Sequence, residues 1–408
     1  MLIKLAWRNL WRNKLRTSII VGAMMFGLVG VIAMMGFMTG FVDSMVKNAI
    51  RWQTSHIQIQ TEPFLRNPEI GELIPNGEVL TDKLKQLEGV ESVSSRFIAD
   101  GMIASARSNR GVRINGIDSK DESQITPLTQ HITHGEWIDD NGRNPILVSE
   151  RMAQRLTLRV GSKVVLTFTD VDGQVAGAAY RVKGIFKTPS SVLDDGNVFV
   201  RKEDLQKTAN MSGVHEVALL LNDPNTLEQQ QRRIDSLASE YGQQLKVRNW
   251  RQIQPILSTM MKSMDVSNQV ILVIFVVAMM FGIINIMLMS VFERTQEFGV
   301  LMAVGMQKHK VFSLIILETS MLGMTGAVFG ISCSALLINI LNSTGISLAS
   351  MSDGLGAYGI DTLLYPRVSL FEYQMIFLTV LVASVLAAVY PARQILKRRP
   401  VDAMAERN

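Results

Sequence analysis

Very few side chains in this sequence combine the type and spacing that catalysis or metal binding requires. His131, His134 and Glu136 lie close together, but no cysteine or further histidine at a ligand spacing joins them, and turn-forming residues surround them. The Asp-Val-Asp-Gly segment at 170–173 lacks the downstream acid of a calcium loop and better fits a hairpin turn. No serine nucleophile elbow and no Gly-x-x-x-x-Gly-Lys-Ser/Thr phosphate loop occurs. The sequence therefore predicts no catalytic residues, no metal site and no cofactor, and any ATP-driven motor must be a separate chain.

One segment, from Glu293 to Lys308, has a pattern suited to transmitting motion. It lies between two long apolar runs, and Glu293 and Glu297 place negative charge where a helix begins. Gly299 and Gly305 interrupt the segment, and lysines close it. A simple turn would need only a few polar residues, whereas this connector is long enough for an ordered amphipathic helix. It is the kind of element on which a motor at the cytoplasmic side of a membrane could act.

The composition indicates a protein that is part membrane and part globular. Hydrophobic residues make up 47% of the 408 residues, which is high for a wholly soluble protein and low for a membrane protein with short loops only. Four apolar runs exceed the length needed to cross about 30 Å of hydrocarbon. We predict an α-helical membrane protein with a large external α+β domain. Its transmembrane helices are expected at residues 18–42, 267–291, 311–342 and 373–391, its external domain at 43–266, its connector helix at 292–310, its external loop at 343–372 and its tail at 392–408.

Lysine and arginine residues predict the orientation of these spans. They cluster before the first span, in the connector and after the last span, whereas the loop at 343–372 contains only Arg367. Because basic residues in short segments stay in the cytoplasm, both termini and the connector are predicted to be cytoplasmic. The basic residues concerned are Lys4, Arg8, Arg12, Lys14, Arg16, Arg294, Lys308, Lys310, Arg393, Lys397, Arg398, Arg399 and Arg407. The positive charge thus indicates membrane topology and contact with anionic lipids, not nucleic acid binding.

The segment before the first span predicts an amphipathic helix in the membrane interface. Ile3, Trp7 and Leu10 recur at three- and four-residue spacing within residues 1–17. The apolar run that follows is too long for a signal peptide and has no Ala-x-Ala site after it, so we interpret it as an uncleaved anchor. Cys333 is the only cysteine, so the external domain is expected to fold without disulfides.

The third apolar run contains one charge and a pair of spaced glycines. Glu318 lies near the start of this run, where an unpaired carboxylate would be costly. Such a charge can mark a functional site, but we expect Glu318 to lie at interface depth on the cytoplasmic side and to pair with a nearby lysine or arginine, since Lys308 and Lys310 are only two or three turns away. Gly326 and Gly330 are four residues apart and would permit close helix packing.

The external domain alternates strand and helix patterns. Two strand–helix–strand units are predicted, one near each end of the domain, and they could pair into a single split α+β module. Their elements are residues 56–60, 81–89 and 90–98 in the first unit, and residues 214–221, 226–241 and 244–249 in the second. Thr81 is expected to cap the first helix. Residues 141–210, between the two units, predict an inserted and mostly β subdomain.

These segments together resemble a known family, the MacB/FtsX/LolC-LolE superfamily of ABC transporter permeases. Residues 5–17, Leu-Ala-Trp-Arg-Asn-Leu-Trp-Arg-Asn-Lys-Leu-Arg-Thr, look like the family's N-terminal helix, and the 293–308 connector looks like its coupling helix. The Ile-Ile-Leu-Glu sequence at 315–318 and the tail at 390–404 are also similar to the family pattern. The external domain resembles the family's porter-like core with an inserted subdomain.

The resemblance implies a permease dimer, homomeric or heteromeric, in the bacterial inner membrane. A separate dimer of ABC ATPase subunits would bind ATP and magnesium, and its closure would act on the outer side of the membrane, a mechanism called mechanotransmission. The residues implied in coupling to that ATPase are Glu293, Glu297, Phe298, Gly299, Met302, Gly305 and Met306.

Within the superfamily, the Ser-His-Ile-Gln-Ile-Gln segment at 55–60 and the lack of an ATPase sequence look most like lipoprotein-releasing permeases. The expected cargo is therefore a lipoprotein or another lipid-linked molecule in the outer leaflet. Two alternatives stay open: FtsX-like regulation of cell-wall hydrolases, and MacB-like export of drugs, toxins or peptides. A lateral cleft for acyl chains is expected to be lined by Met34, Met35, Met38, Phe41, Val270, Ile274 and Val277.

Overall fold

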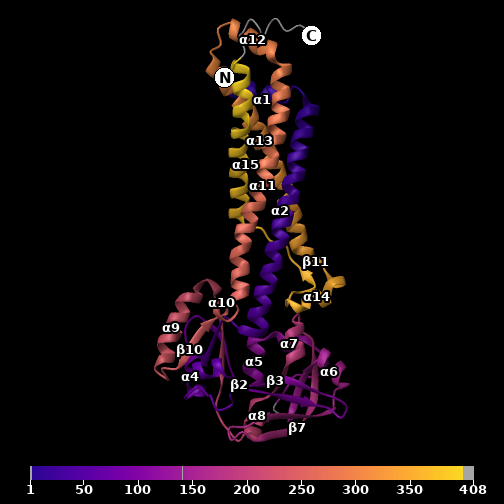
Figure 1. Cartoon of the computed structure of the whole chain (residues 1–408), viewed down its shortest axis with the longest axis vertical. Coiled ribbons are helices and arrows are strands. Elements are labelled where there is room, and N and C mark those ends of the chain that lie inside the picture. The colour runs from indigo at the N-terminus through magenta and orange to yellow at the C-terminus, as the bar shows by residue number, and fades with distance from the viewer. Residues whose placement is uncertain (1, 140, 398–408) are drawn as a thin grey trace. The chain divides into compact units, whose positions relative to one another are not determined.

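The chain folds into two compact units in the computed structural model, which describes residues 2–139 and 141–397 (Figure 1). The helical unit comprises residues 2–42, 261–347 and 363–397, and the α+β domain comprises residues 43–139, 141–260 and 348–362. Three of the basic residues predicted to mark the cytoplasmic tail, Arg398, Arg399 and Arg407, lie outside the described residues.

Four long helices build the helical unit. They are α2 (Lys14–Ala49), α11 (Pro255–Glu293), α13 (Lys308–Thr344) and α15 (Leu370–Lys397). Among the described residues, these four are long and apolar enough to cross a membrane. Together with the α+β domain, they confirm the predicted fold class. Each predicted span lies inside one of these helices, and α2 and α11 continue beyond the spans that the sequence predicts.

The predicted amphipathic helix at residues 1–17 is wrong in its length. The first helix, α1 (Leu2–Leu10), ends well before Thr17, and α2 begins at Lys14. The hydroxyl of Thr17 donates a hydrogen bond to the carbonyl oxygen of Leu10. A carbonyl at a helix end needs such a partner, and this one stabilises a break over residues 11–13.

Glycines set the packing of α13 against its neighbours, as the spacing of Gly326 and Gly330 predicts. A Cβ atom on Gly326 would lie 2.8 Å from the sulfur of Met24 in α2, and one on Gly330 would lie 2.7 Å from the Leu28 side chain. A larger side chain at either position fits only if the Met24 or Leu28 side chain moves, so the two glycines allow α13 to pack closely against α2.

A ten-stranded sheet forms the centre of the α+β domain. Its strands are β1 (Ile57–Thr61), β2 (Val90–Ala104), β3 (Asn109–Ile117), β4 (Ile132–Gly135), β5 (Pro145–Ser149), β6 (Lys163–Thr169), β7 (Val175–Phe186), β8 (Asn197–Arg201), β9 (Glu216–Leu221) and β10 (Leu245–Asn249). The strand order is β10-β1-β9-β2-β3-β8-β5-β7-β4, and β6 pairs with both β2 and β7.

The first and last parts of the domain interleave in this sheet. β1 lies between β10 and β9, and β9 pairs with β2, all in antiparallel register. The helices α4 (Gly77–Lys85) and α9 (Leu227–Ser239) connect the strands of the two units (Figure 1). This is the split module that the two strand–helix–strand patterns predict. Thr81, however, does not cap α4, because it lies inside the helix and donates to the carbonyl of Gly77.

The inserted β region is not self-contained. The pairings β2-β3, β3-β8, β8-β5, β5-β7, β7-β6 and β6-β2 close six strands into a ring. Two of the six, β2 and β3, come from before the predicted 141–210 segment. Closure removes free strand edges, so the inserted strands need β2 and β3 to complete their hydrogen bonding.

The remaining short elements connect these strands. In the α+β domain they are a π-helix (Ile50–Thr54), α3 (Glu62–Arg66), α5 (Ser119–Ile125), α6 (Glu150–Leu156), α7 (Ser191–Gly196), α8 (Lys202–Ala209), α10 (Trp250–Ile253) and α14 (Ser352–Ala357). In the helical unit they are α12 (Thr295–Ala303), β11 (Ile346–Ser347) and β12 (Leu363–Leu364). Residues 348–362, which the sequence predicts as loop, belong to the α+β domain, where the side chain of Asn48 donates to the carbonyl of Gly359 at 2.8 Å.

Candidate functional site

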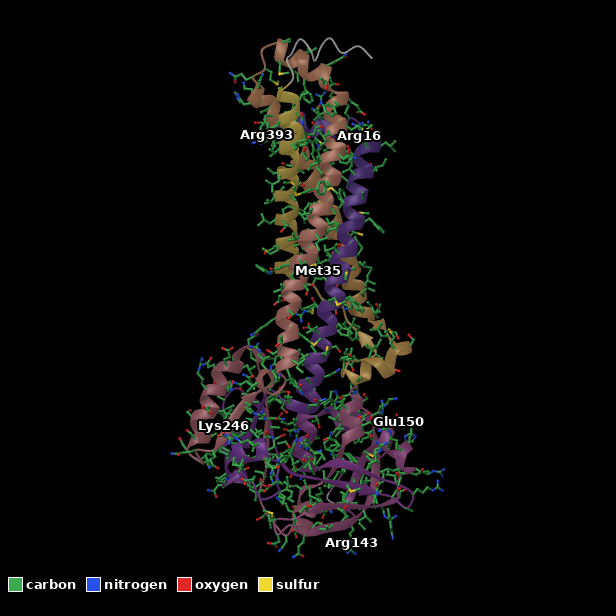
Figure 2. The ribbon with its side chains drawn as sticks, in the orientation of Figure 1. Arg16, Met35, Arg143, Glu150, Lys246 and Arg393 are labelled. Carbon is green, nitrogen blue, oxygen red and sulfur yellow. The ribbon has the colours of Figure 1, made fainter. Side chains whose placement is uncertain are left out.

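Six charged side chains gather around α12 in the helical unit. They are Arg12, Arg16, Glu293, Arg294, Glu297 and Glu318, and we call them the charged cluster. They line a cavity of about 370 Å³ together with polar residues of the α1–α2 break and apolar residues of α2, α11 and α13. Figure 2 shows Arg16 at the end of the helical unit where Arg393 also lies. The cluster holds three positive and three negative groups, so its charges can balance.

Arg294 is the central member of the cluster. Its Nε donates to Glu297 at 2.9 Å, and its Nη1 donates to both carboxylate oxygens of Glu318 at 3.0 and 3.2 Å. Its guanidinium also lies 5.3 Å from the ring centroid of Phe298. The expected pairing of Glu318 with a nearby lysine or arginine is thus present, and the partner is Arg294 at the start of the connector, not Lys308 or Lys310.

Arg12 reaches the cluster from the break between α1 and α2. Its Nη2 lies 2.7 Å from Oε1 of Glu297, and its Nη1 lies 3.3 Å from Oε2. Partial burial opposes the charge on Glu297, but hydrogen bonds from Arg12 and Arg294 outweigh it and hold the pKa of that carboxyl below its usual value. Arg16 donates to Glu293 at the end of α11. The first carboxylates of the connector are therefore ion-paired within the chain itself.

The connector helix is shorter than the predicted 292–310 range. α12 covers Thr295–Ala303, and Gly305, with a φ of +100°, allows the chain to turn after it. Gly299 does not interrupt the helix, since it lies inside α12 and is buried. Phe298 is buried too, and Met302 and Met306 pack partly against the same core.

Two exposed valines lie at the C-terminal end of α12, which the sequence reasoning missed. Val300 and Val304 are 52% and 83% exposed. Val300 lies on α12 and Val304 directly follows its last residue, and their four-residue spacing was the available signal. A solvent-exposed pair of valines beside ion-paired carboxylates is a surface that another protein could cover.

The seven residues predicted to line an acyl cleft do not share one environment. Met35 is buried in the core of the helical unit. Met34 and Met38, by contrast, are exposed on α2, and Phe41 is half-buried against Phe37. Val270, Ile274 and Val277 are exposed on α11. Figure 2 marks Met35 further along α2 from Arg16.

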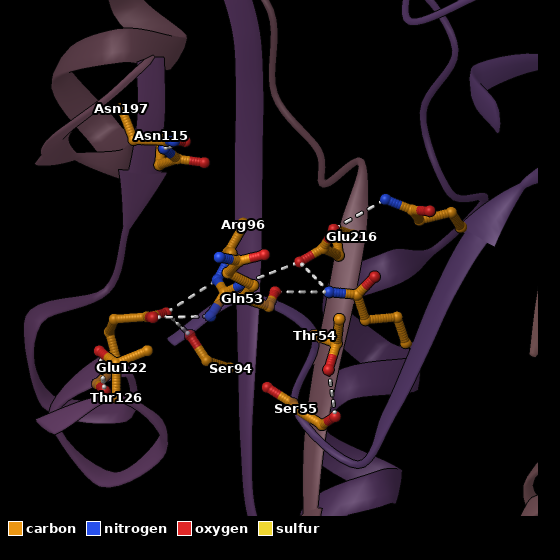
Figure 3. A network of polar contacts seen from close by, with 12 residues as sticks. Gln53, Thr54, Ser55, Ser94, Arg96, Asn115, Glu122, Thr126, Asn197 and Glu216 are labelled. Carbon is orange, nitrogen blue, oxygen red and sulfur yellow. Dashed lines mark hydrogen bonds and ion pairs between the residues drawn. The ribbon is translucent and has the colours of Figure 1, made fainter. Parts of the chain in front are cut away.

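A second polar cluster is buried in the α+β domain (Figure 3). Arg96 of β2 donates to Glu122 through Nε at 3.1 Å and Nη2 at 2.7 Å, and to Glu216 of β9 through Nη1 at 2.8 Å. Burial opposes the charge on Arg96, but the two carboxylates outweigh it and raise the pKa of the guanidinium above its ordinary value. Ser94 also donates to Glu122, and Gln60 donates to Glu216. No spacing signal predicts this cluster, because its members lie on four separate segments, β1, β2, α5 and β9.

The histidine segment considered for metal binding has a packing role instead. The ring of His131 lies edge-on to Trp52, with 4.8 Å between centroids. Within residues 2–139 and 141–397, no three side chains of the metal-ligating types come together.

Two family models match the chain. Residues 17–237 match the MacB-like periplasmic core domain, and residues 269–400 match the FtsX-like permease C-terminal family. The first match alone spans more than half of the chain, from α2 through most of α9. The second covers three of the four long helices and the connector helix α12 between them.

Three relatives show how broad the similarity is. The lipoprotein-releasing system transmembrane protein LolC of Xylella fastidiosa is 24% identical over 324 residues, which cover 76% of this chain and 76% of that protein. The pyoverdine export ATP-binding/permease protein PvdT of Pseudomonas fluorescens is 22% identical over 98% of this chain and 59% of its own length. An uncharacterized ABC transporter permease of Methanocaldococcus jannaschii is 19% identical over 99% of this chain and 97% of its own length.

Proposed function

The chain belongs to the MacB/FtsX-type superfamily of ABC transporter permeases, and from this premise we propose that it releases lipoproteins or other lipid-linked cargo from the outer leaflet of the inner membrane. The relative named as lipoprotein-releasing supports this cargo, since it is similar over the same share of both chains. The exposed Met34, Met38 and Ile274 side chains offer soft apolar surface on α2 and α11, which suits acyl chains.

We propose that α12 is the docking element for a separate ATPase. The observation that supports it best is the pair of exposed valines, Val300 and Val304, at the C-terminal end of a short helix between two membrane-spanning helices. Their outward face presents an apolar contact, while Phe298 and Gly299 hold the other face against the helical unit. A rigid contact of this kind passes a displacement of the ATPase to α11 and α13, which flank α12.

Docking is tested by a charge on the exposed face of α12. Val304→Asp should abolish co-purification with the ATPase and its stimulation in nanodiscs, because a carboxylate would be buried at the contact. Val175→Asp is the matched control, since Val175 is equally exposed but lies on β7 of the α+β domain. If Val304→Asp keeps full ATPase binding and stimulation, docking through α12 is refuted.

The proposed orientation places α12 in the cytoplasm and the α+β domain outside. Single cysteines at Val304 and Lys120, in a Cys333→Ala background, are tested with a membrane-impermeant maleimide on intact cells. Position 120 should react at once and position 304 only after the membrane is opened. Reaction of position 120 from the cytoplasmic side alone would contradict the topology.

The cargo is tested by photo-crosslinkers at Met34 and Met38 in native membranes. Capture of lipoproteins that declines on ATP addition supports release. A crosslinker at Met35, which is buried, is the control and should capture only residues of the permease.

Export of a diffusible molecule is the second candidate, because the relative named for pyoverdine export is similar over 98% of this chain. In that case the same crosslinkers would capture no lipoprotein, and deletion of the gene would raise sensitivity to a secreted compound. Regulation of a cell-wall hydrolase, the remaining alternative within the superfamily, would instead give capture of a soluble enzyme by probes in the α+β domain.

A further inference from the structure

We infer that Arg12 pairs with Glu297 in the free permease, in the place that a basic group of the ATPase takes in the complex. The Arg12–Glu297 ion pair then breaks when the ATPase docks. This inference rests on the proposed docking of α12, and it adds a competition between a segment of the chain and its partner. The observation behind it is that both oxygens of Glu297 already have arginine donors within the chain.

The geometry requires a displacement if the ATPase uses this carboxylate. Oε1 accepts from Nη2 of Arg12 at 2.7 Å, and Oε2 accepts from Nε of Arg294 at 2.9 Å and from Nη1 of Arg12 at 3.3 Å. Each carboxylate oxygen accepts about two hydrogen bonds, so Oε2 is already filled. A basic group of the ATPase that binds both oxygens can therefore do so only after one of the two arginines releases Glu297.

Arg294 is disfavoured on energetic grounds as the arginine that separates from Glu297, because it makes further contacts that would be lost. Its side chain is only 13% exposed, and it also holds Glu318 through two hydrogen bonds and lies over Phe298. Its departure would leave the carboxylate of Glu318 buried without a cation, which is strongly unfavourable. Arg294 thus remains in place and keeps Glu297 oriented toward the surface.

Arg12 has the properties of a releasable partner. Its side chain is 56% exposed and that of Glu297 is 45% exposed, so both can be rehydrated when they separate. It lies in the break between α1 and α2, so no helix has to unwind. Ala6 and Leu10 of α1 stay buried in the core, and the change is confined to the break.

The test measures the affinity of the cognate ATPase subunit for the permease in nanodiscs. Arg12→Gln should tighten binding by up to about fivefold, the factor that an exposed ion pair contributes. Glu297→Gln should weaken binding, because the ATPase loses its acceptor. In the double variant Arg12→Gln/Glu297→Gln, the change at position 12 should have no effect, since nothing is left to compete for. Arg8→Gln is the matched control, with the same loss of charge on exposed α1 and no change in affinity expected.

Each other outcome overturns the competition. Weaker binding of Arg12→Gln would show that Arg12 positions α12 for the ATPase, and unchanged binding would show that the contact is irrelevant. Equal tightening by Arg12→Gln with and without Glu297 would indicate general charge repulsion. If Val304→Asp loses ATPase binding and any of these results is found, docking through α12 stands and only the competition by Arg12 is refuted. If Val304→Asp keeps full ATPase binding, docking through α12 is refuted as well.

Discussion

Replacing Arg96 with methionine should weaken the α+β domain far more than any exposed ion pair can. The change keeps the apolar stem of the side chain but removes the cation that contacts both Glu122 and Glu216. All three side chains are buried, and the sheet register places Arg96 opposite Glu216 on neighbouring strands. Removing one partner of a buried ion pair costs about 3 to 5 kcal/mol, because the remaining charges lose compensation without regaining water.

Arg113→Met is the matched control for this prediction. Arg113 donates two hydrogen bonds to Asp100 across the β2–β3 pair, but both side chains are well exposed. An exposed pair contributes about 0 to 1 kcal/mol. The two variants therefore remove the same residue type from adjacent strands and differ mainly in burial.

Hydrogen exchange of the full-length protein in nanodiscs measures the effect locally. Peptides from β2 and β9 should lose about 3 to 5 kcal/mol of protection in Arg96→Met and less than about 1 kcal/mol in Arg113→Met. A second change, Glu122→Gln, should recover more protection than Glu216→Gln, because Glu122 keeps only Ser94 as a donor in the part of the chain described here. Equal, small losses in both arginine variants would refute the reasoning.

Three further changes test other parts of the fold. Burial raises the pKa of Asp194 to about 6, above its unfolded value, so ionisation of its carboxyl destabilises α7 as pH rises from about 4 to 6. Asp194→Asn should remove that loss of about 3 kcal/mol, so that the protection of α7, measured relative to the intrinsic exchange rate at each pH, no longer falls over this range. Gly326→Leu should disrupt packing against Met24 and lower the thermal stability of the helical unit, while Gly282→Leu, which meets open space on α11, should not. Ser55, with φ +53° and ψ −169°, is in a region that only glycine adopts readily; Ser55→Gly should therefore protect β1 by about 1 kcal/mol in hydrogen exchange, and Ser55→Ala should not.

The architecture could be predicted because its signals are local. A run of about 20 apolar residues requires no tertiary information to be recognised, and the four long helices contain every such run. The pattern of strands such as β1, predicted at 56–60 and found at Ile57–Thr61, is equally local. Which strands pair with one another could not be predicted in the same way. The six-stranded ring includes β2 and β3, which precede the predicted insertion at 141–210.

The charged cluster could not be predicted because its contacts join distant segments. Arg12 and Glu297 are 285 positions apart, and only the packed helices bring them together. The burial of Met35 could not be predicted for another reason. α2 is apolar on nearly all sides over its span, so helical periodicity gives no contrast between a residue that faces lipid and one that faces the core.

The strand order of the α+β domain has a mechanical consequence. Ile57, the first residue of β1, pairs with Asn249, the last residue of β10, and β10 is an edge strand. The chain enters the domain from α2 just before β1 and leaves toward α11 just after β10, so both connections are tied at one strand spacing, about 4.8 Å. A force that spread the two connections would break the β1–β10 hydrogen bonds one after another from that end. A force that moves both connections in the same direction does not pull β1 away from β10. The α+β domain would therefore move as one body when α2 and α11 move together, and the β1–β10 pair would open when they move apart.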